Sequence, residues 1–494
     1  MAWHLTTVRP LKKIESPSDL ITKWTVLESM EAELGIVTGQ PILLPDTGRP
    51  DVDVLRYLNS GSFRRLAKQT KTSYAKDLKI FLNFLDSQNK NWQEASEEDI
   101  FNYEFWRRKD QQNKYRAGGA KFARELASIH RFYEWQVSHD RIPKNPIKII
   151  EARGRDGVLS TSISIMPKNI RNASVKWLTP KAYRQWRDVA MGGYLPNGLQ
   201  DSAWRGRTDG RNIAFTDLLW STGLRISEGA SLLTIELPRL KQGDRYARAR
   251  LGESVAKCGS KRDFWLPKPV VDRIENYIKI DRRQAIERAR REGRYSVNNK
   301  ILIVKTVTSS RMLHYESVSG ISGSIHLDQI DSDLRTLIYV RSGETVEPAF
   351  LWLSESGLPL PVDTWESIFK LANARCKRLR LPIYCHPHML RHSFALKMLV
   401  TLMNVFDRRL GITPEERKEY RMLFGDPWVL VQNLLGHSSP EITKNVYLEP
   451  VKGVQVDLLF SEDDSNYLSV DEMLRKIASE SNMVIDYFAE GSVP

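Results

Sequence analysis

The sequence contains little cysteine and no long apolar run. Three cysteines occur in 494 residues, at Cys258, Cys376 and Cys385. They are too few for a disulfide framework, and this number is typical of a reducing compartment. The longest apolar stretch, 395–406, is interrupted by a lysine and an asparagine and falls short of the roughly 18 residues that span a bilayer. Since the first twelve residues also lack the apolar core of a secretory signal, we expect a soluble, cytoplasmic protein without membrane contact.

Clusters of metal ligands are also scarce. The only candidate is Cys385 with His386 and His388, and it lacks the spaced second pair of a structural zinc site. The sequence shows no acidic pair or His/Asp cluster suited to two metal ions, which disfavours a two-metal nuclease. We therefore predict neither a metal nor another cofactor. Internal repeats are absent as well.

Positive charge is abundant and unevenly distributed. The 74 Lys and Arg exceed the 60 Asp and Glu, for a net charge of +14. Between Val54 and Lys148 there are 19 bases and 11 acids, whereas 461–494 holds eight acids and two bases. A basic surplus favours a polyanionic partner, most often nucleic acid. A well-solvated basic surface is the alternative that charge alone leaves open.

The length indicates more than one domain, because a single core rarely grows past about 300 residues. We predict a mainly α-helical protein with small β-sheets, of the α+β class. The segments that we predict are an N-terminal arm (1–55), a helical domain (56–150), a basic linker (151–175), a domain of mixed helices and short strands (176–460) with an insertion at about 281–347, and an acidic C-terminal tail helix (461–494).

Apolar spacing predicts the helices of the region 56–150. One begins near Lys71, and the apolar residues of its inner face are Tyr74, Leu78, Phe81, Leu82 and Leu85. A second follows Ser96, a good N-cap with three acids after it, and a third runs over 120–137. In the arm we expect one helix around 22–34.

Three short clusters in the second half of the chain contain the side chains suited to chemistry. They are 221–228 with Arg225, 386–392 with His388 and Arg391, and 434–440 with His437, followed by Tyr447. Each cluster taken alone has an ordinary structural explanation, such as an ion pair or a core tyrosine. Together they provide two guanidinium groups that can clamp a phosphodiester, two imidazoles that move protons near neutral pH and a hydroxyl nucleophile.

The order and sequence of these clusters resemble the tyrosine recombinases, also called the phage integrase family. The segments 222–228, 388–395 and 434–439 are similar to the family's two arginine boxes and its Gly-His box. The helical domain at 56–150 resembles the family's DNA-contacting core-binding domain, and 176–460 its mixed α/β catalytic domain. The resemblance extends over roughly residues 55–455.

The resemblance implies a reaction mechanism without metal or ATP. Tyr447 would attack the scissile phosphate and form a 3′-phosphotyrosyl link, which a 5′-hydroxyl of another duplex would later reverse. Arg225 and Arg391 would stabilise the transition state. His388 would assist proton transfer from the tyrosine, and His437 would donate a hydrogen bond to the phosphate.

Two further assignments follow from the resemblance. A hairpin lysine serves the family as general acid for the leaving 5′-oxygen. Lys257 is our choice because it precedes a Cys-Gly-Ser turn, and Lys261 is the rival. Glu228 would orient an arginine, with a surface ion pair as the alternative.

The sequence departs from the family pattern in several places. Tyr447 follows His437 by ten residues, where the resemblance leads us to expect about nine. The segments 281–347 and 407–427 are additional chain that contacts DNA, contacts another protomer, or only enlarges the surface. We also expect the strand 350–352 to follow the first insertion.

The function that we predict is site-specific DNA recombination, for integration, excision or transposition of a mobile element. The predicted partners are double-stranded DNA, further copies of the chain in a tetramer on DNA, and accessory proteins. The apolar stripe of the tail helix, Val470, Met473, Leu474 and Ile477, would dock on a neighbouring protomer, with packing on its own domain as the alternative. The rival functions are DNA relaxation of the type IB topoisomerase kind and a catalytically silent architectural role.

Overall fold

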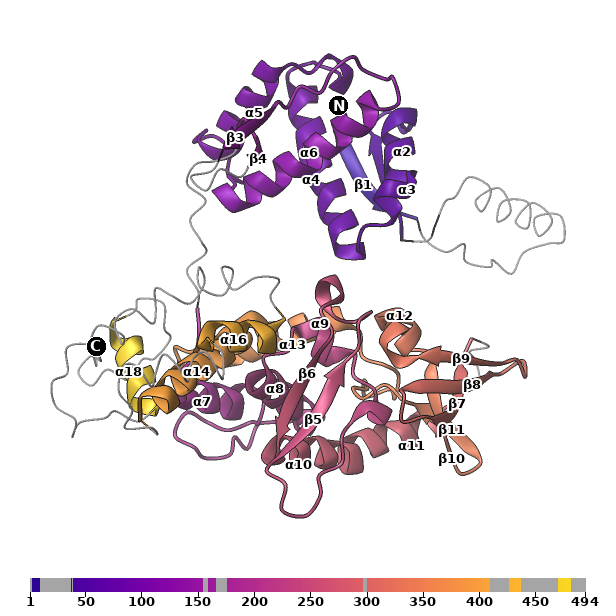
Figure 1. The fold of residues 1–494 in the computed structure, drawn as a ribbon, viewed down its shortest axis with the longest axis vertical. Coiled ribbons are helices and arrows are strands. Elements are labelled where there is room, and N and C mark those ends of the chain that lie inside the picture. The colour runs from indigo at the N-terminus through magenta and orange to yellow at the C-terminus, as the bar shows by residue number, and fades with distance from the viewer. Residues whose placement is uncertain are drawn as a thin grey trace. The chain divides into compact units, whose positions relative to one another are not determined.

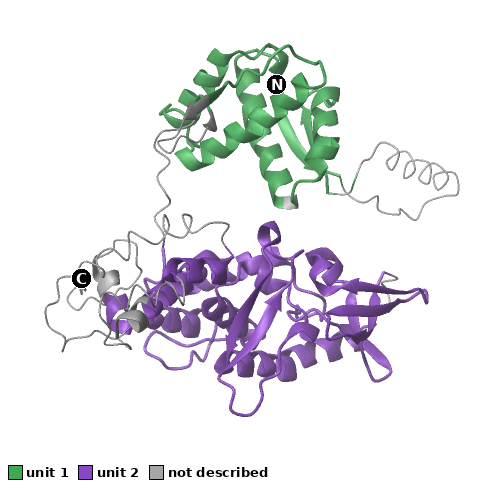
Figure 2. Ribbon diagram, viewed as in Figure 1, with its two compact units in different colours: residues 1–173 green, residues 174–494 purple. Residues whose placement is uncertain are grey.

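A computed structural model describes most of the chain as two compact units, 1–173 and 174–494 (Figure 2). The described residues are 2–8, 37, 39–153, 159–165, 176–295, 300–408, 426–436 and 470–480. None of the described helices is long and apolar enough to cross a membrane.

Unit 1 is mainly helical. Its helices are α2 (Val52–Asn59), α3 (Gly61–Arg64), α4 (Lys68–Ser87), η1 (Trp92–Glu94), α5 (Glu97–Arg108) and α6 (Gly119–Val137). Two antiparallel strand pairs accompany them: β1 (Trp3–Thr7) with β2 (Pro41–Pro45), and β3 (Ile149–Arg153) with β4 (Leu159–Ile163).

The helices predicted over 56–150 are confirmed. The residues of α4 that the spacing placed inside are buried, namely Leu78, Phe81, Leu82 and Leu85, while Tyr74 is partly buried. Ser96 caps α5 in a capping box with Asp99, which satisfies two backbone donors at the helix start. The expected helix around 22–34 lies outside the described residues.

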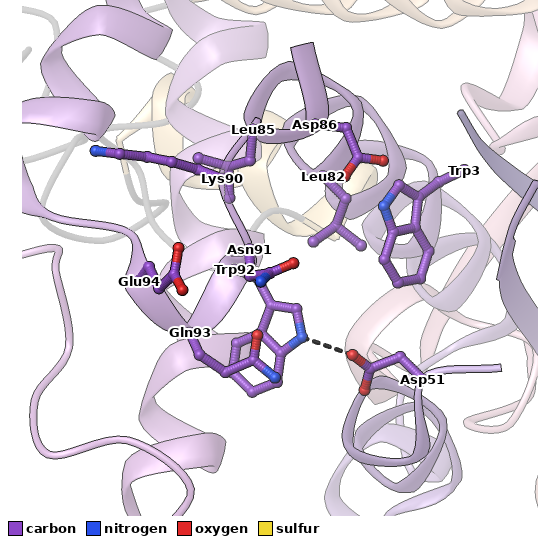
Figure 3. A pocket seen from close by; sticks show the side chains of 10 residues that line it. All are labelled: Trp3, Asp51, Leu82, Leu85, Asp86, Lys90, Asn91, Trp92, Gln93 and Glu94. Atoms are coloured by element: carbon purple, nitrogen blue, oxygen red, sulfur yellow. Dashed lines mark hydrogen bonds between the residues drawn. The ribbon is translucent and has the colours of Figure 1, made fainter. Parts of the chain in front are cut away.

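The first strand pair lies in the segment predicted as an arm and packs on α4 of unit 1. Trp3 and Leu43 are buried in the core of unit 1. The Trp3 backbone N–H donates to Asn83 Oδ1 at 2.5 Å. Trp3 also lines a cavity of about 320 Å³, where Trp92 Nε1 donates to Asp51 (Figure 3).

Unit 2 combines helices with two sheets. Its elements are α7 (Pro180–Ala190), α8 (Asp209–Thr222), α9 (Ile226–Ala230), η2 (Thr234–Glu236), β5 (Tyr246–Leu251), η3 (Lys257–Gly259), β6 (Arg262–Pro267), α10 (Lys268–Tyr277), η4 (Ile278–Arg282), α11 (Arg283–Arg291), β7 (Leu302–Val307), β8 (Met312–Ser317), β9 (Ser322–His326), η5 (Leu327–Gln329), α12 (Ser332–Arg335), β10 (Ile338–Ser342), β11 (Thr345–Pro348), α13 (Val362–Arg378), α14 (Pro387–Arg408), α16 (Pro427–Leu435) and α18 (Val470–Glu480). The predicted class, mainly α with small β-sheets, is therefore correct.

The segment 281–347 contains the larger sheet of unit 2. The sheet has five strands in the order β11-β10-β7-β8-β9, of which only β10 and β7 run parallel. It lies at one end of the unit (Figure 1). Its core includes Leu313, Leu327 and Ile338 and continues into Leu233 and Phe350, outside the segment. Because this core is shared, the sheet is firmly attached to the rest of unit 2.

Two expectations about unit 2 are wrong. Residues 350–352 do not form a strand, since Phe350 makes only an isolated bridge with Leu233. The apolar stripe of the tail helix packs on its own unit, whereas we expected it to dock on a neighbouring protomer. Met473 and Leu474 of α18 are buried in an apolar cluster with residues of α14 and α16 (Figure 1). Within one chain, these helices already offer the apolar surface that the stripe requires.

Candidate active site

The candidate site is built around the carboxyl end of helix α16. The helix ends where Gly436 adopts the left-handed conformation, at φ 64°. The carbonyl of Leu435 accepts a hydrogen bond from Arg391 Nη2 at 2.5 Å, and the next carbonyl, of Gly436, accepts one from Arg225 Nη2 at 3.4 Å. A helix carboxyl end has a partial negative charge that favours cations. The two predicted phosphate ligands are thus brought to neighbouring peptide groups.

Arg225 reaches this position because a sharp turn separates α8 from α9. Gly223 ends α8 with φ 64°, and Arg225 is the N-cap of α9. Arg391 Nη1 donates to the Gly223 carbonyl at 2.6 Å. The first and second arginine clusters are therefore joined directly, although they lie far apart in the sequence.

Glu228, one turn into α9, is a buried carboxylate between two arginines. It is 1% exposed. Its oxygens accept hydrogen bonds from the Arg225 backbone N–H and from Arg225 Nη1, both at 2.8 Å, and from Arg262 Nη2 at 2.6 Å. Burial raises the pKa of Glu228, but the hydrogen bond and charge of Arg262, together with Arg225, lower it to about 2. The residue is an anion at neutral pH, and it lies in the interior rather than in a surface ion pair.

Arg262 is a member of the site that the sequence did not single out. It begins strand β6 and its side chain is 7% exposed. Besides Glu228, it contacts the Leu434 carbonyl through Nε at 3.1 Å. From the sequence alone, Arg262 is one of several basic residues in the hairpin, and such a residue is expected to be exposed to solvent. Its position five residues after Lys257 was the only available signal.

His388 lies in the first turn of α14, with Arg391 one turn further on. Its side chain is exposed. Even so, partial desolvation lowers the pKa of His388, and the charges of Arg391, Lys257 and Arg225 lower it further. The imidazole is therefore neutral at neutral pH and able to accept a proton.

The two hairpin lysines differ in their surroundings. Ten residues connect β5 and β6, and Cys258 and Gly259 have positive φ. Lys261 Nζ pairs with Glu253 at 3.1 Å. No ion pair of Lys257 is found in the described part of the chain, and its charge acts on His388. These surroundings favour Lys257 over Lys261 as the proton donor near the arginines.

The structure brings together five of the seven predicted site residues: Arg225, Glu228, Lys257, His388 and Arg391. His437 and Tyr447 lie outside the described residues, as do residues 409–425 of the second expected insertion. Among the described residues, no group of three or more His, Cys, Asp or Glu could hold a metal ion.

Comparison with known proteins finds relatives that match part of the chain. Residues 55–140 match the family described as phage integrase, N-terminal SAM-like domain. The protein named tyrosine recombinase XerD of Shewanella oneidensis is 22% identical over 260 residues, which are 53% of this chain and 73% of that protein. The XerD of Oceanobacillus iheyensis is 24% identical over 285 residues, 55% of this chain and 82% of that protein. Over about half of its length the chain is similar to tyrosine recombinases.

The match to the SAM-like domain begins within α2 and ends just after α6 of unit 1. Among solved structures, the chain is similar to XerH recombinase bound to palindromic difH substrate in a post-cleavage complex. The identity is 14% and the TM-score 0.45, with 92% of this chain and 100% of that chain covered.

Proposed function

We propose that this protein is a site-specific recombinase that cuts and rejoins double-stranded DNA through a covalent link to Tyr447. One observation above all supports the proposal. Arg225 and Arg391 donate to the consecutive carbonyls of Gly436 and Leu435. Both guanidinium groups are therefore within reach of one phosphate, directly before His437 in the sequence.

In the first step, the phenolic oxygen of Tyr447 attacks the scissile phosphorus. The hydroxyl proton passes to the neutral imidazole of His388. As the new oxygen–phosphorus bond forms, the bond from phosphorus to the 5′-oxygen breaks, and its electron pair stays on that oxygen. The Lys257 ammonium gives a proton to the leaving 5′-oxygen. General acid and base groups of this kind each contribute about 10²- to 10⁴-fold in rate.

The arginines act on the charge that develops on the phosphoryl oxygens. Their guanidinium groups are donors held in place before the reaction starts, so little reorganisation is needed. Glu228 fixes the Arg225 side chain through its 2.8 Å ion pair. His437 donates a further hydrogen bond to the phosphate.

The second step reverses the first with a different 5′-hydroxyl. Because the phosphotyrosyl link conserves the energy of the broken bond, rejoining requires no ATP. Exchange between duplexes requires several copies of the chain on DNA, and we propose a tetramer. The basic region 54–148 holds the DNA backbone, so binding weakens steeply as salt rises.

The biological outcome that we propose is integration, excision or transposition of a mobile element. It is the outcome that the family resemblance leads us to expect. Recovery of the DNA that becomes linked to the protein would identify the element and its joints.

The test is the capture of the covalent adduct. The purified protein is incubated with fragmented DNA of its host, denatured in detergent, and the DNA that remains attached is sequenced. Nicked duplexes built from the recovered sequence should then form an adduct with the wild-type protein and with Tyr467→Phe, the control at the next tyrosine. Tyr447→Phe should form none.

The same duplexes separate the competing functions. An adduct that persists in Tyr447→Phe would contradict the assigned nucleophile. Plasmid relaxation without joined recombinants would indicate a topoisomerase. The absence of an adduct on every DNA tested would indicate an architectural protein.

A further inference from the structure

Two short elements that flank the strands of the five-stranded sheet, α12 and η5, contact the chain next to two of the proposed active-site cations, Arg225 and Lys257. The first contact is made by Arg335 of α12, which is 1% exposed. Arg335 Nη1 donates to the Ser231 carbonyl at 3.0 Å. Ser231 is the C-cap of α9, the helix that begins next to Arg225. The Arg335 guanidinium therefore anchors the carboxyl end of α9.

Arg335 is fixed by several partners at once. It forms an ion pair with Glu236, with Nη2 to Oε1 at 3.0 Å, and donates to the Ile330 carbonyl at 3.1 Å. A buried guanidinium needs such partners to offset the cost of desolvation. The sheet is thereby locked against the segment that follows α9.

The second contact is made by the turn η5, directly after strand β9. The backbone carbonyl of Asp328 accepts a hydrogen bond from the Ser254 N–H at 2.8 Å. Ser254 lies three residues before Lys257, and the intervening Val255 and Ala256 are buried in the core of unit 2. The loop is thus anchored immediately before the lysine.

The Asp328 side chain holds this turn in place. Asp328 is 7% exposed. Its carboxylate pairs with Arg311 at 3.2 Å on one side and with Arg250 of strand β5 at 3.5 Å on the other. Asp328 of the turn η5 therefore contacts both the strand that leads into the loop and the loop itself.

The fit between turn and loop is close. Gly252, the first residue of the loop, is closely enclosed by this turn. A Cβ there would lie 3.2 Å from the Asp328 Cα and 3.3 Å from the Leu327 carbonyl oxygen. Larger side chains at this position would push the loop away from the sheet.

We infer that the inserted sheet is a brace for the general acid, and that Asp328 is a positioning residue for Lys257. The inference rests on the proposed function, because it requires Lys257 to protonate the 5′-oxygen. Without the brace, the loop before Lys257 loses its anchor and the ammonium is held less firmly at the leaving group. Misplacement of a reacting group by about 1 Å can cost about 10²-fold in rate.

A substrate with sulfur in place of the bridging 5′-oxygen isolates this role. When Tyr447 attacks, the bond from phosphorus to sulfur breaks and the electron pair leaves as a thiolate. A thiol has a pKa of about 8.5, far below that of an alcohol, so the thiolate leaves without receiving a proton. A defect in proton donation should therefore disappear on this substrate, while other defects remain.

The experiment compares adduct formation in a single turnover on the oxygen and sulfur substrates. Asp328→Ala and Gly252→Val disturb the brace from opposite sides. We expect each to be slowed about 10- to 100-fold on the oxygen substrate and to match wild type on the sulfur substrate. The control, Asp333→Ala, removes an exposed acid of the same sheet region, whose carboxylate has no hydrogen bond among the described residues. It should equal wild type on both.

Several results would overturn the inference. Equal slowing on both substrates would mean that the sheet affects attack or folding rather than proton donation, and unchanged rates on both would mean that it affects neither. If Asp328→Ala does not fold, Gly252→Val still decides the question. Two other results would contradict the proposed function itself. In one, the wild-type protein forms no adduct. In the other, the sulfur substrate does not restore adduct formation by Lys257→Ala.

Discussion

Arg262 donates a hydrogen bond to the backbone carbonyl of Leu434, 172 residues further along the chain, at 3.1 Å. The same guanidinium pairs with Glu228 at 2.6 Å. Arg262 therefore connects the lysine hairpin, the helix that follows Arg225 and the helix end that precedes His437.

Replacement of Arg262 should reduce catalysis without abolishing DNA binding. Arg262→Gln removes a charged hydrogen bond to Glu228, worth about 1.5–3 kcal/mol, and releases the end of α16. We expect about tenfold or more slowing of adduct formation, measured in a single turnover. The matched control is Arg248→Gln, on the same hairpin, where an exposed arginine pairs with Asp263 at 2.9 Å. Equal effects of the two changes would contradict the connecting role.

A methyl group at Gly436 should damage the site more than backbone strain alone explains. A Cβ there would lie 2.9 Å from Arg262 Nη1 and 3.1 Å from Ser260 Oγ. The left-handed backbone itself costs a non-glycine residue about 1–2 kcal/mol. Gly343→Ala is the control, because Gly343 has a nearly identical φ of 63° and nothing within 4 Å of a Cβ.

Both glycine variants should lose stability in urea unfolding because of the left-handed backbone, and Gly436→Ala should lose more because Arg262 must also move. Only Gly436→Ala should also lose the ability to form the adduct. An active Gly436→Ala protein would show that the arginine cluster tolerates displacement of the helix end.

The ionisation of Glu228 should contribute to stability over a defined pH range. Its pKa is lowered from 4.5 to about 2 in the folded state, so the folded protein favours the anion. The contribution is complete above about pH 4.5 and is lost as pH falls toward 2. We expect up to about 3 kcal/mol, measured as the difference in unfolding free energy between wild type and Glu228→Gln from pH 5 to pH 2.5. A difference that does not change with pH would contradict this role.

The pH dependence of cleavage should reflect His388. The proposed base is active when neutral, and its pKa lies below the usual value of 6.5. The single-turnover rate should therefore stay level as pH falls through 6.5 and decline only below it. Lys257→Ala removes one of the cations that lower this pKa, so on the sulfur substrate the midpoint should move upward. A wild-type midpoint above 6.5 would contradict the assignment.

Much of the fold could be predicted from local patterns. The helix α4 follows from apolar spacing, α5 from the cap at Ser96, and the end of α16 from Gly436. Each depends on residues within one or two turns of each other, where periodicity and capping chemistry act. The strand expected at 350–352 failed, because an apolar run is buried in the same way whether or not it pairs as a strand.

The sequence by itself determined the chemistry available to this protein: two arginines, two histidines, a lysine and a tyrosine in the order of a recombinase, with a surplus of positive charge. Only the tertiary structure decided which groups act on one another. It buried Glu228 between Arg225 and Arg262, packed α18 on its own unit, and placed Asp328 against the loop of Lys257. These contacts join residues far apart along the chain. Their partners are selected by shape and by the need to satisfy buried charge, and neither leaves a periodic trace in the sequence.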